Sequence, residues 1–152
     1  MKAMVGFGFF MLFLGGYALV HLNNMAEDWE NSVPTGQELS ASAWRPSHLG
    51  EMVVDDDSQM YVQFEADGSL GGNGGCNRFF ASYRLEDSKF QVHPISLSRK
   101  ACPEPIMSFE KSFVEAMQLA TVIVGADTRI ALRNERGEPT VRLDAIDRQD
   151  AQ

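Results

Sequence analysis

The residues of this chain best suited to chemistry are two cysteines, Cys76 and Cys102, and three histidines, His21, His48 and His93. A zinc site takes several closely spaced Cys or His ligands, and a dithiol active site takes a CxxC pair. Here 25 residues lie between the two cysteines, and the histidines show no ligand spacing. We therefore expect no metal, no cofactor and no CxxC redox centre.

The two cysteines leave three possibilities open: a disulfide, two inert thiols, or a nucleophile at Cys76. A nucleophilic thiol needs a general base within hydrogen-bond reach, which His48 or His93 would have to supply. In an exported protein a single pair of cysteines normally forms a structural disulfide, and we expect that bond between Cys76 and Cys102. A closed loop of about 27 residues would then stabilise the fold by roughly 3.5 kcal/mol in the chain-entropy model.

A glycine-rich stretch, LGGNGGCNRFFASY at positions 70–83, contains the first cysteine. Glycine lets the backbone take positive φ and lets another group come close, so the stretch is either a ligand cradle or a tight corner. It lacks the Lys-Ser/Thr of a phosphate-binding loop, and Asn77 stands where a GxGxxG motif needs its third glycine. We expect a structural corner.

An uncharged apolar stretch of seventeen residues, positions 4–20, precedes these motifs. A helix over residues 4–22 would be about 28 Å long, close to the hydrocarbon thickness of a bilayer. Lys2 before it and acidic residues at 27–30 after it predict an inner-membrane anchor over residues 1–22, with the rest of the chain in the periplasm. One alternative is a signal peptide cleaved after Gly16-Tyr17-Ala18, giving a periplasmic or secreted protein; another is a buried core helix.

The composition limits what the rest of the chain can bind. Residues 23–42 are polar and lack an apolar period, as expected for a tether. The net charge of −8 argues against a nucleic-acid partner, since phosphate binding needs a basic face. Three aspartates at 55–57 suggest calcium, but Met60 stands where an EF-hand loop needs glycine, so we expect a solvated turn.

Short alternating strands and turns begin at Trp44 and predict three hairpins. These span 60–70 with a turn at 66–69, 83–92 with a turn at 87–88, and 130–143 with a turn at 134–137. Residues 103–120 have a helical period instead. The apolar stripe of that helix, assigned to the core, is Ile106, Phe109, Phe113, Met117 and Ala120, with Glu110, Lys111 and Glu115 on the outer side.

These patterns predict an α+β fold that is mostly β. We expect an antiparallel sheet or an open barrel with one packed helix, plus the N-terminal transmembrane helix. The folded domain should cover residues 43–145, and a flexible tail should cover residues 146–152.

The glycine stretch and the second cysteine together resemble the two motifs of the META domain family, also called HslJ-like. The matching residues are Gly75, Cys76, Asn77, Arg78, Phe79 and Tyr83, followed by Ala101, Cys102, Met107 and Glu110, with Trp44 opening a domain of roughly residues 43–145. One departure is visible: Ser98-Arg99 stands in place of the Thr-Arg pair common in the family.

The resemblance implies a small β-rich domain of bacterial envelope proteins, without an established catalytic activity and loosely associated with stress or drug tolerance. It supplies no active site. In physical terms we expect Asn77 to cap a turn, Phe79 and Tyr83 to fill the core, and Arg78 to pair with Glu110.

Three functions follow as hypotheses. The first is a non-catalytic, membrane-tethered domain that binds an envelope protein or an apolar ligand. The second is a thiol-dependent redox protein or enzyme that uses Cys76. The third is a lipid-binding groove between the helix and an incompletely closed sheet, suggested by the many Phe and Met residues. In each case the membrane contact would be made through residues 4–22.

Overall fold

The computed structural model describes residues 31–56 and 58–151 of the chain. The predicted membrane segment, the possible cleavage site and the first part of the predicted tether lie outside these residues. Within the described part, no helix has both the length and the apolar character to cross a membrane.

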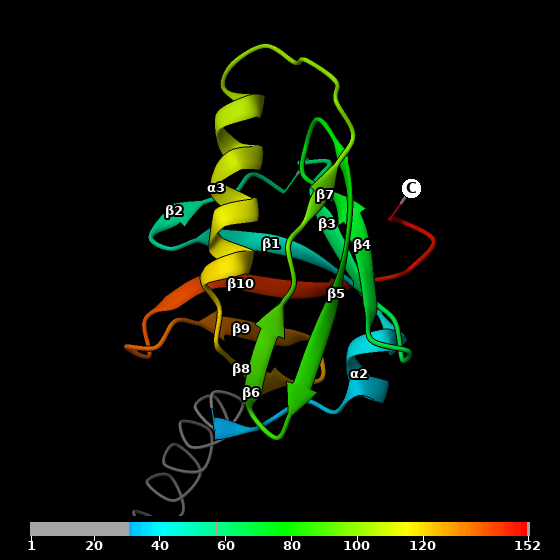
Figure 1. The fold of residues 1–152 in the computed structure, drawn as a ribbon, viewed down its shortest axis with the longest axis vertical. Helices are drawn as coiled ribbons and strands as arrows, with labels where there is room; N and C mark the ends of the chain where they lie inside the picture. Colours follow the sequence, from blue (N-terminus) through cyan, green and yellow to red (C-terminus); the bar gives the residue numbers. More distant parts are fainter. Residues whose placement is uncertain (1–30, 57, 152) are drawn as a thin grey trace, which may run out of the picture.

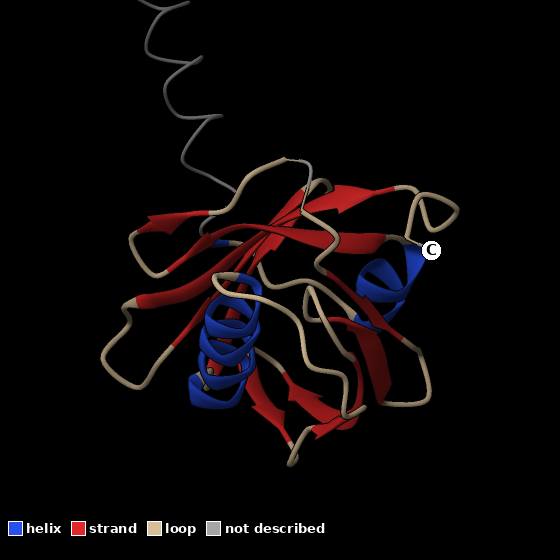
Figure 2. Ribbon diagram, turned by 90° about the horizontal axis from the view of Figure 1, so that it is seen from above, coloured by secondary structure: helices blue, strands red, loops and turns tan. Residues whose placement is uncertain are grey.

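Eight antiparallel strands close into a barrel (Figures 1 and 2). Around the ring the order is β1, β3, β4, β5, β6, β8, β9, β10 and back to β1. Their bounds are β1 (Ala43–Leu49), β3 (Tyr61–Phe64), β4 (Ser69–Asn73), β5 (Arg78–Glu86), β6 (Lys89–Val92), β8 (Val122–Ala126), β9 (Arg129–Arg133) and β10 (Pro139–Ile146). Two short strands, β2 (Met52–Val53) and β7 (Ser96–Leu97), pair with β1 and β5 respectively.

The expected open sheet or open barrel is therefore corrected to a closed one. Closure comes from β10, which pairs with β1 along the whole of that strand, from Ala43 opposite Ile146 to Leu49 opposite Val141. The narrowest junction lies between β6 and β8. One residue pair, Lys89 with Val122, forms the ladder there, extended by backbone hydrogen bonds from Phe90 to Thr121 and from Ile123 to Ser88.

All three predicted hairpins are confirmed as β3–β4, β5–β6 and β9–β10. Their turns take positive φ where the sequence offers a suitable residue: Gly68 at 85°, Asp87 at 53° and Gly137 at 79°. The hairpin formed by β8 and β9 was not predicted. Its turn carries Asp127 at φ 53° and has no glycine at its centre, so the usual turn signal is missing.

The predicted helix is confirmed as α3 (Ile106–Leu119), which contacts β1, β6 and β10 and crosses in front of the barrel in Figure 1. Phe113 and Met117 of its apolar stripe are fully buried among the inward-facing side chains of the strands. The expectation that Glu110 faces outward is wrong, because its side chain is only 4% exposed.

The fold begins earlier than the predicted boundary at residue 43. A short helix, α2 (Gly36–Ala41), lies within the segment expected to be a tether. Thr35 and Glu38 form a capping box at its start: the Glu38 amide donates to the Thr35 hydroxyl, and the Thr35 amide donates to the Glu38 carboxylate. The indole of Trp44 donates to the Leu39 carbonyl at 2.9 Å, which fixes α2 against β1.

The fold also extends beyond residue 145, where a flexible tail was expected. Ile146 is the last residue of β10. Arg148 donates to the Ser40 carbonyl at 2.7 Å and forms an ion pair with Glu65. Ala151 is 5% exposed, so the described part of the tail is packed onto the barrel.

Gly72 in β4 is the tightest glycine position on the barrel wall. A Cβ there would lie 2.1 Å from the Tyr61 carbonyl oxygen and 2.9 Å from the Phe79 ring. We expect Gly72→Ala to lower the free energy of unfolding by more than about 2 kcal/mol, because strand backbone has to move. Urea unfolding followed by tryptophan fluorescence measures the change.

The matched control is Gly36→Ala at the start of α2, where the nearest atom to a new Cβ is the Tyr83 hydroxyl at 3.9 Å. That change should shift the free energy of unfolding by no more than about 0.5 kcal/mol. Equal effects of the two substitutions would contradict the steric account of Gly72.

Candidate functional site

The glycine stretch forms a tight corner between β4 and β5. The Asn73 side chain accepts a hydrogen bond from the Gly75 amide at 2.8 Å, and the Gly74 amide donates to the Asn77 carbonyl at 2.8 Å. Gly75 has φ 110°, a conformation that side chains with a Cβ rarely adopt. The corner predicted from the sequence is thus present, and it is capped by Asn73 instead of Asn77.

The carboxylate of Glu110 in α3 binds this corner from the inside. It accepts hydrogen bonds from the Cys76 amide at 3.1 Å, the Asn77 amide at 2.5 Å and the Asn77 side-chain amide at 2.7 Å. A Cβ on Gly74 would lie 2.8 Å from Cγ of Glu110, so the absence of a side chain there lets the carboxylate approach. Three donors compensate the burial of this carboxylate.

Asn77 extends the same network to the segment that precedes the second cysteine. Its side-chain oxygen accepts from the Ser98 hydroxyl at 2.8 Å and from the Lys100 amide at 2.7 Å, and its Nδ2 donates to the Lys100 carbonyl at 3.3 Å. A disulfide joins Cys76 to Cys102, with their Cα atoms 5.9 Å apart. The corner, the 98–102 segment and α3 are therefore tied together at one place.

The predicted pairing of Arg78 with Glu110 is wrong. Arg78 is exposed at the start of β5, whereas Glu110 is buried and receives its hydrogen bonds from Cys76 and Asn77. Successive residues of a strand point to opposite faces, so Arg78 and the buried Phe79 next to it cannot both face inward.

The aromatic residues of the first motif lie in the core, as expected. Phe79 is fully buried and meets Phe113 of α3 edge to face, with ring centroids 5.8 Å apart. Tyr83 is 8% exposed, and its hydroxyl donates to the Glu65 carbonyl at 2.9 Å. Burial, followed by the nearby Asp67 and Glu65 carboxylates, raises the pKa of the Tyr83 phenol.

The remaining members of the second motif lie at the surface or close to it: Ala101 is exposed, and Met107 is half-buried on α3. Of the two histidines considered as bases, His48 is half-buried in β1 and His93 is exposed just after β6. In the described part of the chain, no group of three or more His, Cys, Asp or Glu side chains is arranged to hold a metal ion.

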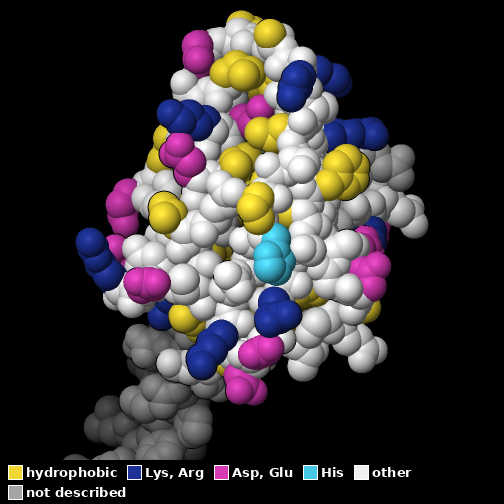
Figure 3. Space-filling model, viewed as in Figure 1, with side chains coloured by type: hydrophobic (Ala, Val, Ile, Leu, Met, Phe, Trp, Pro, Cys, Tyr) yellow, Lys and Arg dark blue, Asp and Glu magenta, His cyan; other side chains and the backbone are white. Residues whose placement is uncertain are grey.

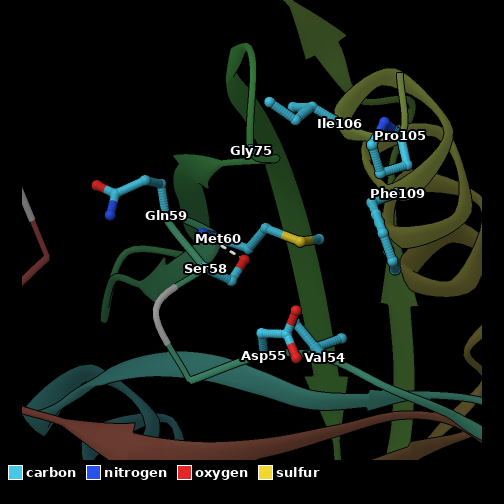
Figure 4. A pocket seen from close by; sticks show the side chains of 9 residues that line it. All are labelled: Val54, Asp55, Ser58, Gln59, Met60, Gly75, Pro105, Ile106 and Phe109. Atoms are coloured by element: carbon cyan, nitrogen blue, oxygen red, sulfur yellow. Dashed lines mark hydrogen bonds between the residues drawn. The ribbon is translucent and has the colours of Figure 1, made fainter. Parts of the chain in front are cut away.

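A pocket of about 320 Å³ lies beside the corner, between α3 and the loop that joins β2 to β3 (Figure 4). In Figure 4 the Met60 side chain extends toward Phe109, with Ile106 above it and Val54 and Asp55 below. The described residues that line it are Val54, Asp55, Ser58, Gln59, Met60, Gly75, Pro105, Ile106 and Phe109. This pocket was not predicted from the sequence. Met60 was expected on a strand face, Phe109 on the apolar stripe of the helix, and residues 55–57 in a solvated turn.

The sequence matches the META domain over residues 37–147. The chain belongs to the META domain family. Its match begins inside α2 and ends just after β10, in agreement with the domain limits seen in the structure. The resemblance of the two cysteine motifs to this family is therefore confirmed.

Solved structures share the fold at low sequence identity. A protein from Burkholderia xenovorans, solved by NMR, is similar with a TM-score of 0.60 and 19% identity, over 77% of this chain and 91% of that one. A second NMR structure of a protein gives a TM-score of 0.59 and 14% identity, over 73% of this chain and 94% of that one. No curated protein matches the sequence.

The disulfide leads to a prediction about stability. Replacing both cysteines, Cys76→Ser with Cys102→Ser, should lower the free energy of unfolding by about 3.5 kcal/mol, because the unfolded chain regains the freedom of a closed loop of about 27 residues. Urea unfolding measures the loss. Intact mass should show the untreated protein two hydrogen masses lighter than the reduced one, and quantitative alkylation of two thiols without reductant would contradict the bond.

The Glu110 contacts lead to a second prediction. Glu110→Gln should lower the free energy of unfolding by about 2–3 kcal/mol, because the acceptor oxygen that faces the Asn77 side-chain amide becomes a second donor, while the other oxygen still accepts from the two backbone amides. Glu115→Gln on the exposed side of the same helix should cost less than about 0.5 kcal/mol, since its contact with Lys111 is a surface ion pair.

A double-mutant cycle separates this contact from a general effect on α3. Adding Asn77→Ala to Glu110→Gln should cost clearly less than the sum of the two single changes, since both remove the same hydrogen bond. Additive losses would show that Glu110 stabilises the helix without acting through the corner.

Proposed function

We propose that this chain is a non-catalytic binding protein of the bacterial envelope. Residues 1–22 anchor it in the inner membrane, and its META domain stands in the periplasm. Three observations support this proposal: the uncharged stretch at 4–20, a disulfide of the kind that persists in oxidising compartments, and a similar fold in a bacterial protein. Cleavage after Gly16-Tyr17-Ala18 would leave the domain in the same compartment without the anchor.

The observation that carries the proposal is the pocket beside the glycine corner. Its volume of about 320 Å³ falls within the size of small-molecule sites, and most of its lining side chains are apolar. Two of its walls adjoin the disulfide: Gly75 precedes Cys76, and Pro105 and Ile106 follow Cys102 by a few residues. A covalent bond and a buried hydrogen-bond network therefore hold the walls in place.

The pocket also lies at a suitable end of the molecule. The first described residues, 31–35, run along the lower end of the barrel in Figure 1, where the Gly125 amide of β8 donates to the Ser32 carbonyl at 2.8 Å. The start of α3 and the 98–105 segment lie at the upper end. A chain that arrives from an anchor at its N-terminus would thus present the pocket on the side away from the bilayer.

Two alternatives receive less support. A thiolate mechanism needs a free sulfur on Cys76, whereas this sulfur is bonded to Cys102. The backbone amide of Cys76 donates a hydrogen bond to the Glu110 carboxylate. The lipid-binding hypothesis requires a groove between the helix and an open sheet. The barrel is closed, and the pocket lies between α3 and the loop that joins β2 to β3.

Photocrosslinking tests the pocket as the binding site. The full chain in nanodiscs of zwitterionic lipid is labelled with a diazirine derivative of 4-phenylbutan-1-ol, and the modified peptides are mapped by mass spectrometry. We expect labelling at residues 54–60 and 105–109, competed by unmodified alcohol. Labelling spread evenly over the domain would contradict the proposal.

A pair of substitutions on α3 provides the control. Ile106 lines the pocket and is 38% exposed, whereas Leu119 lies at the other end of the helix and is 63% exposed. Ile106→Trp should fill the pocket and reduce labelling at least fivefold, and Leu119→Trp should leave labelling unchanged.

A further inference from the structure

We propose that the ligand of this pocket is a small amphipathic amine, whose apolar body contacts Met60 and Phe109 and whose ammonium group pairs with Asp55. This inference rests on the proposed function, because it names the chemical class of ligand for the same pocket.

The pocket has one apolar side and one polar side. Five lining side chains are apolar, contributed by the start of α3 and by both ends of the loop: Val54, Met60, Pro105, Ile106 and Phe109. The polar side chains all come from the middle of the loop between β2 and β3: Asp55, Ser58 and Gln59. A ligand that fills this space must therefore be apolar over most of its surface and polar at one end.

Among the described residues that line the pocket, Asp55 is the charged one. Its side chain is exposed and, within the described part of the chain, accepts no hydrogen bond and forms no ion pair. Its backbone carbonyl accepts a hydrogen bond from the Ser58 amide at 3.0 Å. Its carboxylate therefore keeps its full capacity to accept hydrogen bonds from a ligand.

Gln59 does not compete for the same position. In Figure 4 its amide extends away from α3, on the far side of Met60, whereas the Asp55 carboxylate lies beside Val54 and below the Met60 side chain. The Ser58 hydroxyl is engaged with the Met60 amide, from which it accepts a hydrogen bond at 3.3 Å. Asp55 is thus the group that sets the charge preference.

No basic side chain opposes this preference among the nine described residues that line the pocket. Arg45 does not line this pocket. It lines an adjoining cavity of about 40 Å³ that shares Ser58, Gln59 and Met60 with the pocket and that also has Asp150 in its wall. Residues 31–152 contain 18 Asp or Glu and 12 Lys or Arg, so this part of the chain carries a net charge of −6. The surrounding potential favours cations and disfavours anions.

The face that carries α3 is consistent with an amphipathic ligand. In Figure 3 hydrophobic side chains lie along the middle of this face, and most Lys, Arg, Asp and Glu side chains surround them. Exposed apolar side chains of the domain include Ile106 and Leu119 on α3 and Leu97 on β7.

Three probes with one body and different head groups test the charge preference. These are 4-(4-fluorophenyl)butylamine, the corresponding alcohol and the corresponding carboxylate. Binding to the full chain in zwitterionic nanodiscs is followed by ¹⁹F NMR, and the signal change seen with empty nanodiscs is subtracted. We expect the amine to bind about fivefold more tightly than the alcohol, and the carboxylate to bind more weakly than both. Added salt should weaken the amine selectively.

Asp55→Asn should bring the amine to the affinity of the alcohol and leave the alcohol within twofold of its original value. The matched control is Asp56→Asn, which removes the same charge from the next residue, an exposed one that does not line the pocket. That control should retain most of the preference for the amine.

The outcomes separate this inference from the proposed function. The inference is overturned if the three probes bind equally, or if the preference for the amine persists in Asp55→Asn. In either case, loss of alcohol binding in Ile106→Trp would still support the pocket as the binding site. If the alcohol binds no better to the original chain than to Ile106→Trp, both the inference and the proposed binding site are overturned.

Discussion

The buried carboxylate of Glu110 is the contact on which the rest of this domain depends. It is 4% exposed and receives three hydrogen bonds from Cys76 and Asn77, so the helix that carries it has one permitted position against the β4–β5 corner. A buried carboxylate without those donors would be strongly unfavourable. The position of α3 over the barrel, the approach of the two cysteines and the upper wall of the pocket all follow from this contact.

Local signals in the sequence were sufficient for the hairpins and for α3. Alternating apolar residues and turn residues such as Gly68 and Gly137 lie within a few positions of one another, so each hairpin is encoded where it forms.

The outward placement predicted for Glu110 was wrong for a physical reason. Position 110 is three residues before Phe113 and seven before Met117, on the buried stripe, but its charge suggested the outer side. Its partners come from 33 and 34 residues earlier, which helical periodicity does not reveal.

The domain limits and the barrel closure could be predicted only in part. The Thr35-x-x-Glu38 pattern is a capping-box signature, so α2 was within reach of sequence analysis. The pairing of β1 with β10 and the contacts of Arg148 with Ser40 and Glu65 join residues that lie 83 to 108 positions apart, and no local pattern encodes them. The pocket has the same origin, because its walls come from three separate segments.

The disulfide has a thermodynamic consequence through its place between two of those segments. Gly75 and Ile106 belong to different walls of the pocket, and the Cys76–Cys102 bond lies between them along the chain. If the pocket binds a ligand as proposed, oxidation and occupancy are linked reciprocally: a molecule that prefers the assembled walls makes the bond harder to reduce, and an oxidising environment favours capture of that molecule. In such an arrangement the thiol–disulfide balance of the compartment would set how much ligand the protein retains.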